Sequence, residues 1–156
     1  VLLAIGRRGS PRKLGVPGEE KGKVAYRLLE PEMIHNQKIL VVGGGDSAIE
    51  SALLLADENN KVTLSYRSDS FSRLKPKNEE KINNAIRSGK VKVILKSEVS
   101  EILDASVILK LQDSDIPLVI ENDLVYIFAG GILPTKFLED IGIRITKKFG
   151  EAILKH

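Results

Sequence analysis

The sequence predicts an α/β domain built on a central parallel sheet, and two observations indicate this. A glycine-rich turn, Gly43–Gly45, directly follows the apolar run Ile39–Val42 and precedes a segment with a helical apolar stripe. Between Glu98 and Phe128 the pattern changes to short strand-like runs separated by Asp, Ser, Asn and Pro, which is typical of an antiparallel meander. We therefore expect a Rossmann-like three-layer fold with a parallel sheet and an antiparallel β-meander.

Three segments precede the glycine turn. The apolar run Val1–Ile5 predicts a short buried strand, and the glycine-, proline- and arginine-rich stretch 7–22 predicts a connection. Val24–Leu29 is expected to form a short helix that Pro31 limits. Residues 1–37 are therefore expected to be a strand and a linker, with the main domain beginning near Lys38.

Four runs predict the parallel sheet: Ile39–Val42, Val62–Tyr66, Val91–Leu95 and Leu124–Phe128. The remaining runs of the last third predict the meander: Val99–Ile102, Val107–Leu111 and Leu118–Ile120. We expect the Rossmann domain to span 38–131 and a return segment to span 132–156, with a short helix after Pro134.

Two helices are expected between the parallel strands. The first runs from the glycine turn to about Asp57. For the second, Asn78 is the expected N-cap, and Gly89 is placed to follow the last turn. Its first turn would hold Glu79 and Glu80, and its inward residues would be Ile82, Ala85 and Ile86.

The composition excludes several classes of function. The 156 residues contain no cysteine and only two histidines, which excludes disulfides, thiol redox pairs and thiolate metal sites in this segment. No apolar run reaches the roughly 18 residues needed to span a bilayer. No Met and no cleavage-site pattern open the chain, so we expect a segment of a longer cytoplasmic protein.

Basic charge is concentrated in one block. Residues 61–96 contain ten Lys and Arg against three Asp and Glu, whereas residues 97–128 contain one against seven. This block is either a solvated basic face or contains an anion site. Aromatic residues make up only 4% of the chain, which disfavours a nucleic-acid platform.

The glycine turn predicts that the bound anion is the pyrophosphate of a dinucleotide. Gly43, Gly45 and Ala48 match the pattern G-x-G-x-x-[GA] of dinucleotide-binding folds. The first glycine allows the tight turn, the second allows close approach of a pyrophosphate, and the small Ala48 allows the helix to pack closely on the strand. The pyrophosphate would lie at the helix N-terminus, where unpaired N–H groups favour an anion.

The end of the second strand distinguishes the two nicotinamide dinucleotides. An acidic side chain there would accept hydrogen bonds from a free ribose 2′-hydroxyl, but this chain has Tyr66 and Arg67 instead. A guanidinium suits a 2′-phosphate, and Arg73 with Lys75 could close the other side of it. The alternative is that all three are ordinary surface cations.

These motifs resemble the NAD(P)H domain of thioredoxin-reductase-like pyridine nucleotide flavoprotein oxidoreductases, and the resemblance extends over nearly all of the chain. Residues 3–19 resemble the strand and loop by which that family leaves its FAD domain, and residues 42–50 resemble its second fingerprint. Residues 66–71 resemble its His-Arg-Arg-Asp-x-Phe phosphate loop, and residues 128–135 resemble its return segment towards FAD.

The resemblance implies a role for individual residues. Gly45, Asp46 and Ser47 would contact the pyrophosphate, Arg67 would hold the 2′-phosphate, and Glu50 would lie near the nicotinamide half. The expected cofactor-binding residues are Gly43, Gly44, Gly45, Asp46, Ser47, Ala48, Glu50, Tyr66, Arg67, Ser68, Arg73, Lys75, Gly130 and Gly131. No catalytic residue and no metal ligand is assigned.

Two departures from the family pattern limit the expectation. Ala25–Lys38 lacks the Cys-x-x-Cys that members reducing disulfides carry before the fingerprint, so ferredoxin, another protein, a low-molecular-weight disulfide or a small molecule remains open as electron acceptor. Ser68 stands where the phosphate loop has its second arginine, so NADH is a second candidate beside NADPH.

The resemblance therefore implies an NADPH-binding module of an FAD-dependent oxidoreductase, which places the nicotinamide for hydride transfer to flavin. Its partners would be the dinucleotide and the FAD domain of the same chain, with a homodimer of the parent protein left open, and with no nucleic acid and no membrane. The segment alone would not enclose FAD and would not turn over. The alternative is a stand-alone nucleotide-binding or sensing module.

Overall fold

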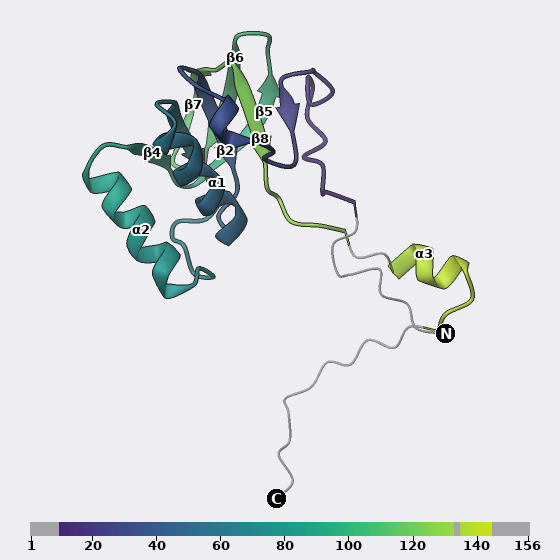
Figure 1. Ribbon diagram of the computed structural model, residues 1–156. Helices are drawn as coiled ribbons and strands as arrows, with labels where there is room; N and C mark the ends of the chain where they lie inside the picture. Colours follow the sequence, from purple (N-terminus) through teal and green to yellow (C-terminus); the bar gives the residue numbers. More distant parts are fainter. Residues whose placement is uncertain (1–9, 133–134, 145–156) are drawn as a thin grey trace, which may run out of the picture. The chain divides into compact units, whose positions relative to one another are not determined.

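A computed structural model describes residues 10–132 and 135–144. Pro11–Gly130 forms one compact unit, and the described residues from Gly131 onward belong to a second. The second unit contains helix α3 (Thr135–Asp140), which confirms the short helix expected after Pro134 (Figure 1). The strand expected over Val1–Ile5 lies outside the described residues.

The central sheet of the first unit contains the four expected strands. These are β2 (Lys38–Val42), β3 (Lys61–Ser65), β4 (Val91–Ile94) and β8 (Leu124–Ile127), and every pairing among them is parallel. The sheet order is β1-β8-β2-β3-β4. Counted from β2 along the chain, these four strands have the order 3-2-1-4 of a Rossmann half, so the predicted fold class is confirmed.

The two central strands, β2 and β8, are largely apolar because both faces of the sheet are covered. Helices α1 (Asp46–Asp57) and α2 (Pro76–Arg87) cover one face, where Ile39 and Val41 of β2 pack against Ala48, Ile49 and other apolar residues of the helices. Leu40, the residue between them, points to the opposite face and is fully buried there.

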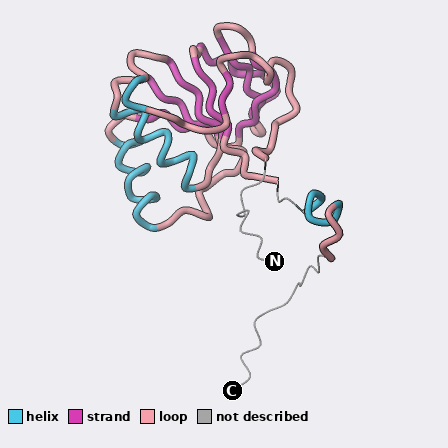
Figure 2. The backbone as a smooth tube through the Cα atoms, turned by 45° about the vertical axis from the view of Figure 1, so that its right-hand side comes forward, coloured by secondary structure: helices cyan, strands magenta, loops and turns pink. Residues whose placement is uncertain are grey.

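The opposite face is covered by the expected antiparallel meander. Its strands are β5 (Ser97–Ile102), β6 (Ser106–Leu111) and β7 (Ser114–Glu121), in that order. Val99, Val107 and Leu109 pack on Leu40 and Val125 of the central sheet. The unit is therefore three-layered, with helices, a parallel sheet and an antiparallel sheet, as Figure 2 shows in cyan and magenta.

The helix expected over Val24–Leu29 is wrong. Val24–Ala25 forms strand β1 instead, which pairs parallel to β8 with Val24 opposite Val125. The Val125 N–H donates to the Lys23 carbonyl at 2.9 Å, so this edge pairing decides the conformation. A short 3-10 helix, Pro31–Met33, follows where Pro31 was expected to end the segment.

The N-cap expected for α2 is also wrong. The helix begins at Pro76, Lys75 is its N-cap, and Asn78 lies inside the first turn with a buried side chain. Proline suits the first helical position because its missing N–H would have no partner there. Gly89 has φ +73° after the last turn, as predicted, but Ile86 is 40% exposed and does not face inward.

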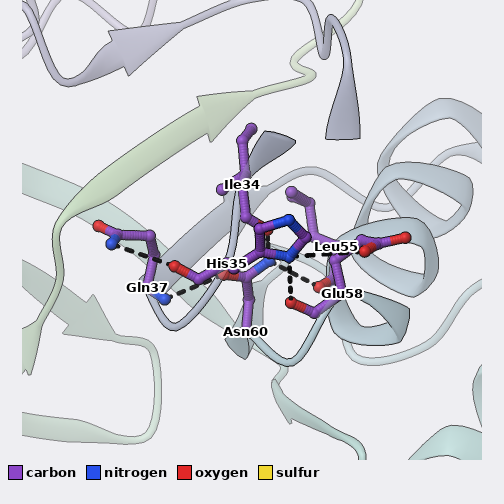
Figure 3. A network of polar contacts seen from close by, with 6 residues as sticks. All are labelled: Ile34, His35, Gln37, Leu55, Glu58 and Asn60. Carbon is purple, nitrogen blue, oxygen red and sulfur yellow. Dashed lines mark hydrogen bonds and ion pairs between the residues drawn. The ribbon is translucent and has the colours of Figure 1, made fainter. Parts of the chain in front are cut away.

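A buried amide joins the loop before β2 to the end of α1. Asn60 Nδ2 donates to the carbonyls of Ile34 at 2.6 Å and Leu55 at 2.9 Å, and its Oδ1 accepts from the Gln37 N–H at 2.9 Å. His35, beside this network, faces Glu58 from the loop (Figure 3). These bonds fix the entry into β2 and thus the register of the strand that precedes the glycine turn.

Candidate functional site

The glycine turn lies where the strand order changes direction. It follows the carboxyl end of β2, whose two neighbours are β3 on one side and β8 on the other. The Gly43 N–H donates to Ser65 O of β3 at 3.0 Å, and the Phe128 N–H donates to Val42 O at 2.7 Å. Such switch points are where open α/β sheets bind ligands.

The three glycines of the turn serve three different purposes. Gly43 has φ +141°, and a Cβ there would lie 2.6 Å from Phe128 O. A Cβ on Gly44 would lie 2.3 Å from the Tyr66 ring. Gly45 has an ordinary extended conformation and nothing within 4 Å of an added Cβ. Gly43 and Gly44 are therefore required by the fold, whereas Gly45 leaves open space in front of α1.

That open space adjoins backbone donors to which the described part of the chain offers no partner. The first bonds of α1 run from the Ala48 and Ile49 N–H groups to Gly45 O, at 3.0 and 3.2 Å. The N–H groups of Asp46 and Ser47 precede these bonds, and Gly45 supplies no side-chain cap. Buried Ala48 keeps the first turn close to Gly43. Donors, dipole and space at this point fit a pyrophosphate.

The Asp46 carboxylate is directed to α2. Its Oδ1 accepts from Asn78 Nδ2 at 2.7 Å and from the Lys75 N–H at 3.1 Å. The bond from Asn78, followed by that from Lys75, lowers the pKa of Asp46. Since the carboxylate is engaged and negative, what Asp46 can offer an anion is its backbone N–H.

Glu50 lies one turn further along the same face of α1. Its side chain is exposed, and Glu50 Oε1 accepts from the same Asn78 Nδ2 at 2.8 Å. Ser47, one position after Asp46, is exposed. Asn78 therefore links Asp46 to Glu50, although the sequence analysis did not assign Asn78 to the site.

The loop after β3 is held by its backbone. Tyr66 N–H donates to Ile94 O at 3.0 Å, and the Ser68 carbonyl accepts from the Lys96 N–H at 3.0 Å. Gln112 Nε2, at the turn between β6 and β7, donates to the Arg67 carbonyl at 2.9 Å. The Tyr66 ring stacks on Phe71 with centroids 5.5 Å apart. The backbone at Arg67 is thus supported by the meander.

The cations of this loop are available to a ligand. Arg67, Arg73 and Lys75 are exposed, and none forms an ion pair within the described part of the chain. Nearby Lys96 differs, because its Nζ pairs with Asp113 at 2.9 Å. The first acidic residue after β3 is Asp69, which accepts a hydrogen bond from Ser70.

The two glycines after β8 fall in different units. Gly130 ends the first unit with φ +88°, and its carbonyl accepts from the Arg12 N–H at 3.0 Å. Gly131 belongs to the second unit.

Within residues 10–132 and 135–144, no group of three or more His, Cys, Asp or Glu side chains could hold a metal ion, and no helix is long and apolar enough to cross a membrane.

Sequence reasoning missed Asn78 and Gln112. Pro76 was the available signal for Asn78, since a proline at the first helical position places Asn78 inside the helix rather than at its cap. No local signal pointed to Gln112, which lies 45 residues from Arg67 in the chain.

The model of one protein family matches the sequence over almost its entire length. It is described as pyridine nucleotide-disulphide oxidoreductase, and it covers residues 1–155. The chain belongs to this family. Several relatives are named as ferredoxin–NADP reductases and one as a thioredoxin reductase, which agrees with the oxidoreductase family that the resemblance implied.

Individual relatives carry several activities in their names. A ferredoxin–NADP reductase of Ignicoccus hospitalis is 38% identical over 103 residues, which are 66% of this chain and 32% of that protein. A bacilliredoxin reductase of Bacillus subtilis is 29% identical over 150 residues, or 96% of this chain and 46% of that protein.

Solved structures agree with the fold. A bacillithiol disulfide reductase from Bacillus cereus matches with a TM-score of 0.82 and 28% identity, over 89% of this chain and 43% of that one. A thioredoxin reductase from Lactococcus lactis matches with a TM-score of 0.74 and 31% identity, over 85% and 45%. The chain thus spans about a third to a half of these relatives.

Proposed function

We propose that this pyridine nucleotide-disulphide oxidoreductase domain binds NADPH at the N-terminus of α1 and presents its nicotinamide to FAD in the whole protein. One observation carries the proposal. The open space at Gly45, beside unpaired N–H groups, adjoins a strand that is followed by the exposed Arg67. The N–H groups would then bind the pyrophosphate, and Arg67 would bind the 2′-phosphate.

The pyrophosphate half of the site is assigned to the glycine turn. Gly45 admits the pyrophosphate, and the N–H groups of Asp46 and Ser47 donate to it. Because NADPH and NADH share the pyrophosphate, these residues contribute equally to both. They account for dinucleotide binding and not for the choice between the two.

The choice of NADPH is assigned to the loop after β3. An exposed guanidinium at Arg67 can donate bidentate hydrogen bonds to the 2′-phosphate, with Arg73 and Lys75 adding positive charge. The position holds no acidic side chain for a free 2′-hydroxyl. Ferredoxin–NADP reductases among the relatives support this choice.

When bound, NADPH supplies a hydride and FAD accepts it. The residues described above bind and orient the dinucleotide, and we assign none of them a proton transfer. Positioning of two reactants can by itself contribute several kcal/mol to lowering a barrier, roughly 7–11 kcal/mol at the upper end. The proposed contribution of this domain is therefore geometric.

The proposal is tested by titrating NADPH into the purified chain by calorimetry, with Gly45→Val as the variant. A valine fits the backbone at Gly45 but fills the open space, so binding should be lost while the fold remains. Gly22→Val is the matched control, because Gly22 also has nothing within 4 Å and no positive φ. Equal binding by all three proteins would contradict the proposal.

A second experiment addresses the role of the domain in the whole protein. Rapid mixing of NADPH with the full-length flavoprotein should bleach the flavin absorbance, and Gly45→Val should slow this reduction. A full-length protein that binds NADPH without reducing a flavin would instead favour the nucleotide-sensing alternative.

A further inference from the structure

Asn78 occupies a buried position between α1 and α2. The residue is 6% exposed, and its Nδ2 donates to Asp46 Oδ1 at 2.7 Å and to Glu50 Oε1 at 2.8 Å. Both acceptors are carboxylates, which when ionised can only accept, so the amide nitrogen must face them. The two hydrogens of one NH₂ group are therefore shared between two acidic residues of α1.

The Asp46 carboxylate would obstruct an anion if it turned the other way. Asp46 is the first residue of α1, and a carboxylate there is attracted to the positive helix end and to the unpaired N–H groups. A carboxylate in that place would compete for the donors and would repel a pyrophosphate. In this structure it instead accepts two hydrogen bonds from the start of α2.

We propose that Asn78 is a positioning residue that holds the Asp46 carboxylate on α2 and thereby keeps the N-terminus of α1 open to the pyrophosphate of a dinucleotide. This inference rests on the proposed function. Asn78 acts through Asp46 and touches no part of the cofactor. Glu50, on the second hydrogen of the amide, fixes the direction in which the Asn78 side chain points.

The inference separates Asn78 from Arg67 in its effect. Because the pyrophosphate is common to NADPH and NADH, loss of Asn78 weakens both by the same factor. Loss of Arg67 weakens NADPH alone. A released carboxylate at a helix N-terminus corresponds to an effect of about two- to fivefold on the dissociation constant.

The test is a double-mutant cycle with Asn78→Leu, Asp46→Asn and the double variant, each titrated with NADPH and with NADH. Leucine has the same number and branching of side-chain heavy atoms as asparagine, although it is the larger residue, and it donates no hydrogen bond. We expect Asn78→Leu to raise both dissociation constants about two- to fivefold. The double variant should bind as tightly as Asp46→Asn alone, since no charge is left to be released.

The possible results are distinguishable. A double variant as weak as Asn78→Leu would assign Asn78 a packing role only and would overturn the inference, as would an unchanged Asn78→Leu or a loss confined to NADPH. A wild-type chain that binds neither dinucleotide would instead contradict the proposed function. Circular dichroism checks each fold, and Asn78→Ala, which also donates no side-chain hydrogen bond, replaces Asn78→Leu in the cycle if the leucine variant does not fold.

Discussion

Asn78 Nδ2 lies 2.7 Å from Asp46 Oδ1, so the start of α2 is tied to the first turn of α1. This bond connects the two parts of the proposed site. The first turn of α1 carries the donors for a pyrophosphate, and the segment leading into α2 carries Arg73 and Lys75. This bond, with those from Lys75 N–H to Asp46 and from Asn78 to Glu50, thus joins the segment proposed to bind the pyrophosphate to the segment proposed to bind the 2′-phosphate.

Arg67→Ala should lower the affinity for NADPH by roughly ten- to a hundredfold and leave that for NADH nearly unchanged. A hydrogen bond to a charged group contributes about 1.5–3 kcal/mol, and only NADPH has the 2′-phosphate. Calorimetric titration of both dinucleotides measures the difference. Arg87→Ala is the matched control, because Arg87 is also exposed but lies at the far end of α2.

Salt and Arg73 refine this prediction. Added salt should reduce the preference for NADPH, because screening weakens exposed charge pairs more than it weakens contacts at the glycine turn. Arg73→Ala should act in the same direction as Arg67→Ala but less, since neighbouring Lys75 can partly replace it. Equal losses of NADPH and NADH affinity in Arg67→Ala would refute the assignment of the 2′-phosphate.

Gly44→Ala should destabilise the fold, whereas Gly45→Ala should not. A Cβ on Gly44 would lie 2.3 Å from the Tyr66 ring, which is stacked on Phe71 and cannot retreat easily. Overpacking of this kind costs about 1–3 kcal/mol. Denaturant unfolding measures it.

A second substitution identifies the cause of that loss. Tyr66→Ala in the Gly44→Ala background removes the ring and should recover part of the lost free energy of unfolding. If the double variant were less stable than the sum of the single changes, the contact with Tyr66 would not be the reason that position 44 is glycine.

Glu19 should make stability depend on pH in the acid range. Burial by itself would raise the pKa of Glu19, but hydrogen bonds from the Leu14 N–H, the Tyr26 hydroxyl and the Gly15 N–H outweigh it and lower the pKa below 4.5. The stabilisation is therefore complete above about pH 4.5 and is lost as the pH falls through the lowered folded pKa.

Comparison with Glu19→Gln isolates this contribution. The difference in free energy of unfolding between wild type and Glu19→Gln should shrink as the pH is lowered from 7 towards about 3, because the wild-type carboxylate is then protonated. Glu20→Gln, at an exposed neighbouring position, is the control. A difference that stays constant over this range would show that the charge of Glu19 is not what the loop requires.

The parallel sheet could be predicted because its strands are buried on both faces. Such strands need apolar runs like Ile39–Val42, which are visible locally. Strand β1 could not be predicted, since two residues form it only by pairing with β8, about a hundred residues later in the chain. Its local pattern fitted a helix, and the tertiary pairing overrode that preference.

The site divides in the same way. The glycine turn is a local pattern whose spacing predicts a strand, a turn and a helix, and all three are present. Asn78 has a good N-cap side chain, but its partners are Asp46, 32 residues earlier, and Glu50. A residue type that serves equally at a cap and in a buried bridge does not reveal which one the fold uses.

The bond from Gln112 to the Arg67 carbonyl has a consequence for redesign of cofactor preference. In the proposed function, the turn between β6 and β7 positions the backbone of Arg67 and thereby the guanidinium that would bind the 2′-phosphate. The turn itself contributes no cation to the site. Exchanging side chains at 67–75 alone would leave that support unchanged. A mutant library aimed at NADH should therefore vary Gln112 and Asp113 together with the phosphate loop.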